Sequence, residues 1–578
     1  MYKRIKNIFP FIKEIILISL LHVIAVYLTA QENSGTKEIK AAFSELDSRG
    51  EIYFSIPLEG TNLQDLATML SVHDVQGDSI YAFANKKGFR EFLTLNLPFH
   101  LKQFQSPPML NKRRYDVPGF YYPTYHEYVQ LMESYANDFP GICSLIVAGE
   151  SVLNRKILFL KITGNPGLQE AEPEFMFSAA MHGNETAGYP LMIKLIDSLL
   201  NGYDENAHVK KLVDNMEIWI NPLANPDGMY NAGNNSVLLG TRFNANNIDL
   251  NRNFPDPVNG DHPDDNPWQP ETEAMMHIMK TNNFVLSANF HSGTEVVNYP
   301  WDSFSSLHPD NDWYISISRQ YADTVFKYST AYFDSPEFNY GIINGYEFYP
   351  VHGGRQDYMN YFMHGREVTI EISDDFFTPG DELAKLWDYN KRSLFGMFQH
   401  TMYGIHGLVS DSATGDPLHA KISILSHDKN KSFVYADSDA GDFYRMLLPG
   451  IYHLEISVDG YLTKYLNVTL DETKKKENLN ITLVKDATWA KGLMKEVDFL
   501  FTNPVKEQIK IYFPGSTLGD KNIKILDLNG RVFHDQTYSG IMKNVVINTA
   551  HFHQGIYLMS VVIREEISTR KIIVIKNE

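Results

Sequence analysis

The first residues in this chain whose types and spacing could do metal chemistry are His182 and Glu185, which follow the small-residue run Ser178-Ala179-Ala180. An imidazole nitrogen and a carboxylate oxygen on a strand-to-helix turn can face one point, as two zinc ligands must. A catalytic zinc then needs one more protein ligand and an open position for water. A His-x-x-Glu pair also arises by chance among surface residues, so the rest of the chain must decide.

A second histidine could supply the third ligand. His291 follows the apolar run Val285–Phe290 and is therefore predicted to stand at the end of a strand. Together with His182 and Glu185 it makes a His2Glu set, which has the three protein ligands of a catalytic zinc. A lone histidine after a strand is more often a satisfied polar residue, but the joint occurrence of both halves favours a zinc site.

The stretch Ile248–Pro255 lies between these two halves and is rich in groups that bind anions. Arg252 beside Asn251 could hold a carboxylate through two parallel hydrogen bonds. Upstream, Arg242 could stabilise negative charge on a carbonyl oxygen. A turn with a solvated arginine is the alternative interpretation of this stretch.

A carboxylate and a tyrosine complete the candidate set. Glu371 lies within the β-branched and apolar run Glu367–Ile372, where it is either a paired structural acid or a general base beside a metal. Tyr349 lies in a loop that could close over a substrate, although tyrosines in loops are usually just packed.

Helical and apolar strand patterns alternate between residues 121 and 401. The helical patterns cover 125–137, 189–200 and 271–281, and the strands cover 157–162, 174–180, 216–221, 285–290 and 367–372. This alternation predicts an α/β fold, a mixed sheet with helices on both faces. Ligands bind beyond the carboxyl ends of strands in such sheets. His182, His291 and Glu371 fall at or near strand ends, which favours one shared site.

Length and composition limit the number of domains and the class of partner. The 578 residues are too many for one core and indicate several domains, and 43% hydrophobic residues indicate a globular chain. A net charge of −19 argues against a nucleic-acid partner, because phosphate binding needs a clustered basic face. The single cysteine, Cys143, excludes an intramolecular disulfide and is expected to be buried.

The chain divides into five predicted segments. Residues 1–30 have the basic start, apolar core and small-residue end of a signal peptide; an uncleaved anchor is the alternative, and no stable membrane span is expected. Residues 31–110 predict a small accessory or propeptide-like domain, with a merely structural domain equally open. Residues 111–402 form the α/β domain, and 403–485 and 486–578 predict two small all-β sandwich domains.

The motifs His-x-x-Glu, Asp-x-Asn-Arg, a strand-end His, Tyr-x-x-x-Gly-Gly and a late Glu follow one another in this order. On these motifs, residues 121–485 resemble the zinc metallocarboxypeptidases of the carboxypeptidase A/B clan. The resemblance is closer to their N/E-type branch, which joins the peptidase to a transthyretin-like β-sandwich. It implies one zinc ion held by His182, Glu185 and His291, with Glu371 as general base.

The same resemblance implies how a peptide would bind. Arg242 matches the arginine at the scissile carbonyl, and Asn251 with Arg252 matches the pair that binds the C-terminal carboxylate. Tyr349 matches a mobile tyrosine. Asp249 matches an aspartate that orients the first zinc histidine, a role that metal chemistry itself requires.

For specificity, the resemblance implies that Asp302 and Gln356 read the last side chain of the substrate. An aspartate in a dry pocket selects Lys or Arg by charge pairing. Asp302 could instead be a surface residue, and Arg355 would oppose basic substrates if it pointed inward. Asn184 stands where digestive members carry arginine, and the N/E-type branch shares the asparagine.

Residues 486–578 resemble the C-terminal sorting domains of type IX secretion in Bacteroidetes. The motifs that carry this match are Asn503-Pro504-Val505, Asp527-Leu528-Asn529-Gly530-Arg531, Gly555-Ile556-Tyr557 and Thr569-Arg570-Lys571-Ile572-Ile573. The implied partner is the type IX secretion machinery, and the implied location is secreted or attached outside the outer membrane. A plain adhesion sandwich is the alternative.

Taken together, these resemblances imply a secreted zinc carboxypeptidase. It would release a C-terminal residue, Lys or Arg, from peptides or proteins through zinc-activated water with Glu371 as base. Two alternatives stay open: a zinc amidohydrolase acting on N-acyl amino acids or cell-wall peptides, and an inactive peptidase-like surface binding module.

Overall fold

The computed structural model describes residues 36–102, 120–486, 499–513, 520–528, 530–539, 543–563 and 566–576. The predicted signal peptide at 1–30 lies outside these residues. The chain forms two compact units: residues up to 458 with 463–483, and residues 459–462 with 484–578. In the part of the chain that is described, no helix is long and apolar enough to cross a membrane.

The centre of the first unit is an eight-stranded mixed sheet with the order β11-β10-β12-β9-β7-β8-β6-β5. Its strands are β5 (Cys143–Glu150), β6 (Lys156–Ile162), β7 (Glu174–Ala179), β8 (Glu217–Asn221), β9 (Phe284–His291), β10 (Thr294–Tyr299), β11 (Ile342–Asn344) and β12 (Glu367–Ser373). The neighbours β12, β9, β7 and β8 are parallel, so their carboxyl ends share one edge. These four strands are buried along their whole length, as parallel strands covered on both faces are.

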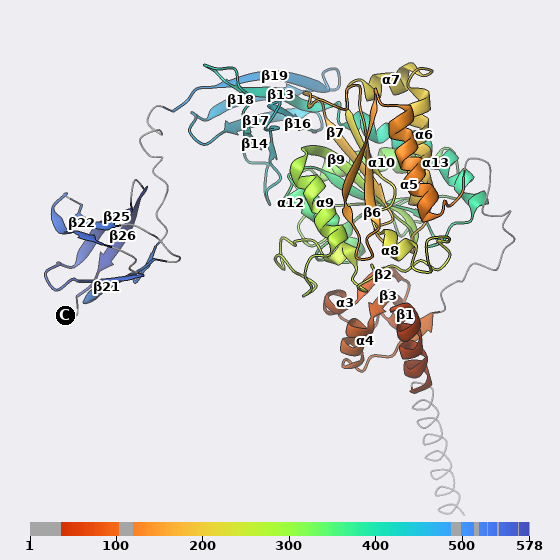
Figure 1. Cartoon of the computed structure of the whole chain (residues 1–578), viewed down its shortest axis with the longest axis horizontal. Helices are drawn as coiled ribbons and strands as arrows, with labels where there is room; N and C mark the ends of the chain where they lie inside the picture. The colour runs from red at the N-terminus through yellow and green to blue at the C-terminus, as the bar shows by residue number, and fades with distance from the viewer. Residues whose placement is uncertain are drawn as a thin grey trace, which may run out of the picture. The chain divides into compact units, whose positions relative to one another are not determined.

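Helices cover both faces of this sheet (Figure 1). They are α5 (Tyr125–Asp138), α6 (Gly188–Gly202), α7 (Ala207–Val213), α8 (Pro226–Met229), α9 (Pro270–Thr281), α10 (Asn311–Phe326), α11 (Gly345–Phe348), α12 (Arg355–Tyr361) and α13 (Gly380–His400). One face buries its apolar side chains against α5, α6, α10 and α13, and the other against α9 and α12. We refer to residues 120–402 as the α/β domain. The fold class predicted for it, a mixed sheet between two helical layers, is confirmed.

A smaller α/β unit precedes this domain, and we call its residues 36–102 the N-terminal module. After a helix over 36–49 it contains β1 (Glu51–Pro57), α3 (Leu63–Met69), β2 (Ser71–Gln76), β3 (Ser79–Asn85), α4 (Lys86–Leu93) and β4 (His100–Lys102). Its antiparallel sheet has the order β2-β3-β1-β4. Asn62 and Asn85 begin α3 and α4 by accepting main-chain hydrogen bonds, which is what N-cap side chains do. A cluster of phenylalanines fills the core between sheet and helices.

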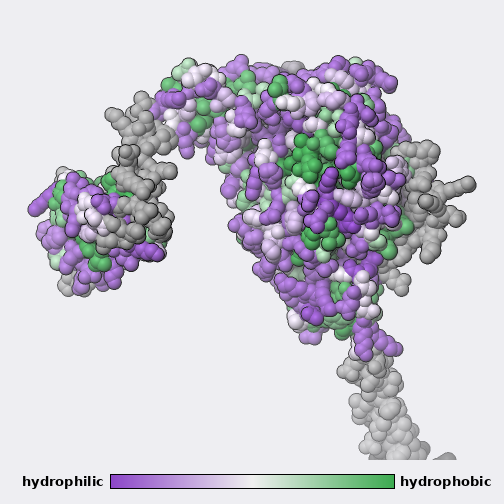
Figure 2. Space-filling view, viewed as in Figure 1, coloured by the Kyte–Doolittle hydropathy of each residue, from purple (hydrophilic) through white to green (hydrophobic). Residues whose placement is uncertain are grey.

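A β-sandwich domain follows the α/β domain in the first unit. It contains β13 (Gly404–Asp411), β14 (Lys421–Ile424), β15 (Val434–Tyr435), β16 (Asp442–Arg445), β17 (Gly450–Ser457), β18 (Lys464–Leu470) and β19 (Lys476–Leu483). They form the sheets β16-β13-β19 and β15-β14-β17-β18. The visible surface of the first unit is mostly hydrophilic, with a few hydrophobic areas (Figure 2).

The second unit is a separate pair of antiparallel sheets, β20-β21-β24 and β23-β22-β25-β26. Its strands are β20 (Leu500–Phe501), β21 (Gln508–Tyr512), β22 (Lys521–Asp527), β23 (Val532–Tyr538), β24 (Asn544–Asn548), β25 (Gly555–Ile563) and β26 (Glu566–Val574). Its strands alternate buried and exposed residues, and the buried ones form a core of their own. The two all-β sandwiches expected after the α/β domain are therefore present.

Candidate metal and substrate site

The candidate metal-binding side chains stand at one edge of the central sheet. Strand β7 leads into the turn that carries His182. His291 is the last residue of β9, and Glu371 on β12 is its register partner. A Cβ on Gly183 would overlap the backbone of Gly228. Only glycine therefore allows the close approach that holds the turn of His182 in place.

His182, Glu185 and His291 direct three donor atoms to one point. Nδ1 of His182 lies 2.8 Å from Oε1 of Glu185, and Nδ1 of His291 lies 2.8 Å from Oε2 of the same carboxylate. The two Nδ1 atoms are 3.0 Å apart. Within the described residues this is the group of His, Cys, Asp or Glu side chains that could hold a metal ion. Two imidazole nitrogens and a carboxylate are ligands that zinc accepts, so the set fits zinc.

The outer nitrogens of both histidine rings are also held. Oδ1 of Asp249 lies 3.0 Å from Nε2 of His182, and the side-chain amide of Asn289 lies 2.7 Å from Nε2 of His291. The carboxylate of Asp249 can only accept, so it keeps a proton on Nε2 of His182 and leaves Nδ1 of that ring free to bind a metal. The amide of Asn289 fixes the orientation of the His291 ring. Burial opposes the ionisation of Asp249, but Arg242 and His182 hold the pKa of its carboxyl well below the usual range.

Glu371 presents an unsatisfied carboxylate oxygen beside these donors. Its side chain is buried, and Oε2 has no hydrogen-bond partner among the described residues. Burial raises the pKa of Glu371 well above its usual range, and the nearby carboxylate of Glu185 adds to the rise. A buried polar atom without a partner is costly, so Oε2 is suited to a ligand or water molecule.

Two buried arginines adjoin the three donors. Arg242 donates from Nη1 to Oε1 of Glu185 over 2.9 Å and from Nε to Oδ2 of Asp249 over 3.1 Å. Arg252 ends the 3₁₀ helix η2 (Leu250–Arg252) and donates to a main-chain carbonyl of strand β2. Its Nε atom has no partner among the described residues. Both guanidinium groups are shielded from water, which strengthens their electrostatic interactions. Arg242 is already paired with two carboxylates, whereas Nε of Arg252 is free to meet a further anion.

Asn251 and Tyr349 flank Arg252. Oδ1 of Asn251 accepts a hydrogen bond from the main-chain N–H of Arg355 over 3.0 Å, which fixes the amide. Tyr349 is buried and its pKa is raised above the usual range, chiefly by burial, while the charge of Arg252 opposes this rise and that of Glu371 adds to it. The phenol therefore lies near both charges.

Asp302 and Gln356 meet in a closely packed part of the domain. Nε2 of Gln356 donates to Oδ1 of Asp302 over 2.8 Å. Asp302 is only 4% exposed, and a Cβ on Gly345 would overlap its carboxylate. Burial and the neighbouring Asp357 raise the pKa of Asp302 well above its usual range. Asp302 is thus an interior acid whose hydrogen-bond donor is a neutral amide.

Arg355 does not offer its charge to this acid. Its guanidinium is fully buried and forms a two-pronged ion pair with Glu367, at 2.9 and 3.0 Å. The remaining Nη1 contacts the hydroxyl of Ser178. Because the carboxylate of Glu367 already neutralises Arg355, the guanidinium of Arg355 does not oppose a basic substrate side chain at Asp302.

Sequence reasoning missed Asn289 and the contribution of the N-terminal module. Asn289 precedes His291 by two residues on β9, and residues at this spacing share a face of a strand, so alternation could have found it. In the module, Oγ of Ser71 accepts from Nε of Arg242 over 2.7 Å, and Oε2 of Glu51 accepts from the N–H of Arg242 over 2.9 Å. No local pattern marks Ser71 or Glu51, because these contacts depend on how the module docks.

Comparison with known proteins gives two family matches. Residues 128–393 match the zinc carboxypeptidase family, and residues 500–576 match the secretion system C-terminal sorting domain. A sorting domain of this kind implies secretion or attachment to the cell surface. Among solved structures, carboxypeptidase A from Helicoverpa armigera is similar at 19% identity and a TM-score of 0.46, covering 60% of this chain and 96% of that chain.

Several curated relatives are carboxypeptidases of the N/E-type branch. Human carboxypeptidase D is 35% identical over 62% of this chain and 26% of its own length, so the chain spans about a quarter of that relative. Mouse carboxypeptidase M is 34% identical over 58% of this chain and 78% of its own length. The catalytic chain of human carboxypeptidase N is 32% identical over 61% and 83%. The protein therefore belongs to the zinc carboxypeptidase family and ends in a type IX secretion sorting domain.

Proposed function

We propose that this protein is a secreted zinc carboxypeptidase that hydrolyses the last peptide bond of peptides or proteins and releases Lys or Arg. One observation carries the proposal. A three-donor metal site, an unpartnered carboxylate oxygen and two buried arginines converge at one edge of the sheet. The metal site suits the scissile carbonyl and a water molecule, the carboxylate suits the proton that is transferred, and the arginines suit the two negative charges of the reacting peptide.

The metal would be held by His182, Glu185 and His291, whose rings Asp249 and Asn289 orient. Zinc bound there supplies Lewis acidity toward a carbonyl oxygen and toward a water molecule. The orienting hydrogen bonds keep both Nδ1 atoms directed inward. They support a single geometry of the site, which a catalytic metal requires.

Glu371 is placed to move the proton. Its Oε2 atom is free to accept a proton from an attacking water molecule, and the protonated acid can then give this proton to the departing amine. Burial raises the pKa of Glu371, and a cation held by the three donors beside it would favour the ionised form that accepts a proton. General base and general acid are therefore the same residue at successive stages.

The arginines would bind the two negative charges of the reacting peptide. Arg242 contacts Glu185 and can stabilise the charge that develops on the scissile carbonyl oxygen. Arg252, supported by Asn251, can bind the substrate's free carboxylate through parallel hydrogen bonds. Tyr349, which lies near Arg252 and Glu371, would cover the bound residue. A required free carboxylate restricts cleavage to the last peptide bond.

Asp302 and Gln356 support the specificity for basic residues. The charge of Arg252 acts on Asp302, so this acid adjoins the group that would hold the terminal carboxylate. A buried carboxylate is stabilised by a cationic partner, and the substrate's Lys or Arg side chain could provide one. Gln356 holds the carboxylate in place without neutralising it.

Export through the outer membrane would depend on residues 486–578. The match of 500–576 to sorting domains supports handling by the type IX secretion machinery, with the enzyme released or attached outside the cell. There it would meet peptide and protein C-termini.

The test compares three substrates with the zinc-loaded full chain: hippuryl-Arg, hippuryl-Phe and N-acetyl-Arg. We expect kcat/KM for hippuryl-Arg to exceed that for hippuryl-Phe by about tenfold or more, because one charge-assisted hydrogen bond is worth roughly 1.5–3 kcal/mol. Faster hydrolysis of N-acetyl-Arg than of either hippuryl peptide would favour an amidohydrolase instead. Failure to retain zinc in stoichiometric amount after dialysis would favour an inactive binding module.

A further inference from the structure

A groove separate from the metal site lies where the α/β domain meets the β-sandwich domain, and we call it the seam groove. The α/β domain contributes residues just before β7 and β8, and the sandwich contributes one residue each from β13, β16 and β19. The lining residues are Glu170, Ala171, Glu172, Pro173, Asp214, Asn215, Met402, His406, Tyr444 and Lys476. Because β7 and β8 are parallel, their amino ends lie at the edge of the sheet opposite the one that carries the metal site.

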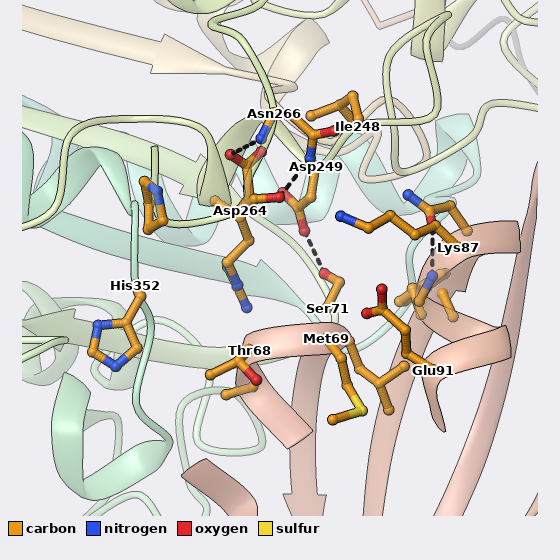
Figure 3. Close-up of a pocket in the computed structure, with 18 of the residues that line it drawn as sticks. Thr68, Met69, Ser71, Lys87, Glu91, Ile248, Asp249, Asp264, Asn266 and His352 are labelled. Atoms are coloured by element: carbon orange, nitrogen blue, oxygen red, sulfur yellow. Dashed lines mark hydrogen bonds between the residues drawn. The ribbon is translucent and has the colours of Figure 1, made fainter. Parts of the chain in front are cut away.

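Another pocket, shown in Figure 3, lies between the N-terminal module and the α/β domain. Ser71 and Asp249 point towards each other on its wall, and a dashed line marks their hydrogen bond. Because Asp249 orients a candidate zinc ligand, this pocket adjoins the site described above. The seam groove shares no lining residue with it, so its ligand must be sought separately.

One wall of the seam groove carries a histidine nitrogen without a partner. His406 is only 3% exposed, and its Nε2 atom lies 3.1 Å from the carbonyl oxygen of Tyr403. A carbonyl oxygen can only accept, so the proton is on Nε2 and Nδ1 keeps a lone pair. Burial lowers the pKa of His406 to about 4, so the ring is neutral at neutral pH. Nδ1 has no hydrogen-bond partner among the described residues and can accept a hydrogen bond from a ligand.

Carboxyl groups of both domains gather beside the seam groove. Asp442 lies on β16 two residues before Tyr444 and is only 4% exposed, yet its Oδ1 atom has no hydrogen-bond partner among the described residues. Burial raises the pKa of Asp442 to about 7, and the charges of Asp437 and Glu217 add to this rise. Burial and the charge of Glu217 likewise raise the pKa of Glu174 to about 8. A cation beside these groups would offset their mutual repulsion.

The other contact between the two domains is neutralised from within the protein. There two arginines donate to the carboxylate of Asp310, at 2.6–3.0 Å. Beside the seam groove, Lys161 pairs with Glu217 over 2.7 Å, but Glu174 is held by two neutral N–H donors. The acids on this side of the sandwich therefore have fewer cationic partners than the acid on the other side.

The groove itself combines charged groups with apolar surface. Glu172 is half-buried, and its Oε1 atom accepts from the hydroxyl of Thr163 over 2.5 Å, which fixes the carboxylate at the wall. Lys476 contributes a positive charge at the start of β19. Apolar surface on the same walls comes from Ala171, Pro173 and Met402. The groove has a volume of about 340 Å³, which is at the lower end of the range for small-molecule sites.

The donor atoms of the groove are too widely spaced for one metal ion. Among the described residues, the group of three His, Cys, Asp or Glu side chains whose donor atoms lie within 4.8 Å of one another is that of the metal site. His406, Glu172 and Asp214 do not come together in this way. Acceptors spread over a groove with apolar walls suit an extended organic cation instead.

We propose that the seam groove binds a small aliphatic ammonium compound, whose N–H groups donate to Nδ1 of His406 and to the carboxylate of Glu172. Its alkyl chain would lie on Pro173 and Met402. Lys476 would attract a carboxylate on the same compound, as free lysine has, whereas a diamine would bind through the acceptors alone. The site goes beyond the proposed peptidase activity and does not depend on it.

The experiment measures binding to the zinc-loaded full chain by isothermal titration calorimetry at physiological ionic strength. The ligands are L-lysine, cadaverine, which is lysine without its carboxylate, and tetramethylammonium, which has a positive charge but no N–H donor. We expect the tighter of the first two to bind about tenfold or more tightly than tetramethylammonium, because hydrogen bonds to a charged group contribute this much. Equal binding of all three would mean that only the net charge of −19 attracts cations, and would overturn the proposal.

The order of the first two ligands identifies the source of the ammonium group. Tighter binding of L-lysine would support an amino acid whose carboxylate meets Lys476, and Lys476→Gln should then abolish the preference over cadaverine. Tighter binding of cadaverine would support a diamine, which Lys476 repels, and Lys476→Gln should then strengthen its binding.

Two substitutions locate the ligand in the groove. Glu172→Gln and His406→Ala should each raise Kd by about tenfold or more, because each removes an acceptor of the ammonium group. The matched control is Glu205→Gln, an exposed residue outside the groove, which should leave Kd unchanged. Melting temperatures show whether each variant is folded, and the half-buried Glu172 decides the outcome if His406→Ala unfolds. Wild-type affinity in folded Glu172→Gln would overturn the proposal.

Free lysine could also enter the substrate site, so Asp302→Asn is measured alongside. This variant should bind L-lysine in the seam groove with unchanged Kd. Loss of lysine binding in Asp302→Asn, with wild-type affinity in Glu172→Gln, would place the ligand at the metal-site edge and overturn the proposal. Cadaverine binding that Glu172→Gln weakens would support the seam groove even if the chain does not hydrolyse hippuryl-Arg, so the two proposals can fail separately.

Discussion

Two clusters of buried charge in the α/β domain differ in where their partners come from. In the interdomain cluster, the carboxylate of Asp310 receives Arg366 from the same domain and Arg445 from β16 of the β-sandwich domain, at distances of 2.6–3.0 Å. Arg445 also donates to Asp428 over 2.8 Å. In the metal-site cluster, two histidine Nδ1 atoms face each other over 3.0 Å, and Oε2 of Glu371 has no partner among the described residues.

This difference separates a cluster that holds domains together from one prepared for a ligand. Both clusters bury charge, which is costly unless each charge is paired. The interdomain cluster is paired by residues of the α/β domain and the β-sandwich domain. In the metal-site cluster, Ser71 and Val72 of the N-terminal module contact the two arginines, and the three donor side chains suit a cation. Substitutions should therefore affect stability at the first cluster and chemistry at the second.

The largest effect on turnover is expected for Glu371→Gln in the metal-site cluster. Removing a general base lowers kcat by about 10²–10⁴-fold, while the amide keeps the size and shape of the side chain. Zinc content and melting temperature should stay at wild-type values, because Glu371 is not among the three donor residues. The measurement is kcat with hippuryl-Arg alongside zinc by mass spectrometry. Turnover within tenfold of wild type would mean that another group carries the proton.

The opposite outcome is expected for Asp310→Asn in the interdomain cluster. The substitution leaves Arg366 and Arg445 buried without their shared counter-charge, and breaking a buried ion pair in this way costs about 3–5 kcal/mol. Urea unfolding should show this loss, whereas kcat per folded molecule should not change. The control is Glu382→Gln, which breaks the exposed pair with Lys385 at 2.8 Å and should cost no more than about 1 kcal/mol.

The same aspartate also gives the direction of a pH effect. Burial opposes its ionisation, but Arg445 and Arg366 hold the folded-state pKa of Asp310 well below the usual value, which is about 3.9 in unfolded chains. Its contribution to stability is therefore present above about pH 4 and is lost as pH falls through the lower, folded-state pKa. The gap in unfolding free energy between wild type and Asp310→Asn should narrow below pH 4. A constant gap would show that charge is not the cause.

The two clusters also differ in how far the sequence predicts them. His182, Glu185 and His291 belong to short motifs that follow apolar runs, and parallel strands necessarily bring such ends to one edge. The mixed sheet could be predicted for the same reason. Asp310 and Arg445 are 135 positions apart on two domains, and Ser71 and Asp249 are 178 apart. Contacts of that kind depend on the docking of finished domains, which no local pattern encodes.

A smaller effect is expected for Asp302→Asn at the specificity pair. The amide keeps the hydrogen bond with Gln356 within reach but removes the charge that would attract a basic side chain. The preference for hippuryl-Arg over hippuryl-Phe, taken as the ratio of kcat/KM values, should fall by about 10–100-fold, which corresponds to the roughly 1.5–3 kcal/mol of a hydrogen bond to a charged group. Activity on hippuryl-Phe should be retained. If the preference for hippuryl-Arg persisted in Asp302→Asn, another acid would be responsible for the basic specificity, and Asp302 would have no role in substrate binding.

The smallest effects concern the two residues that hold the histidine rings, Asp249 and Asn289. Replacing a hydrogen-bond partner of a metal-binding histidine weakens metal affinity by about 10–100-fold, so Asp249→Asn and Asn289→Ala should each weaken zinc binding by this amount in competition with a chelating dye. Asp249→Asn should have the larger effect, because it also removes a charge that pairs with Arg242 at 3.1 Å. Equal zinc affinity in the wild type and both variants would mean that His182 and His291 bind zinc without help from Asp249 and Asn289. The metal-site cluster would then be as self-sufficient as the interdomain one, and the contrast between them would rest on Glu371 and the two arginines alone.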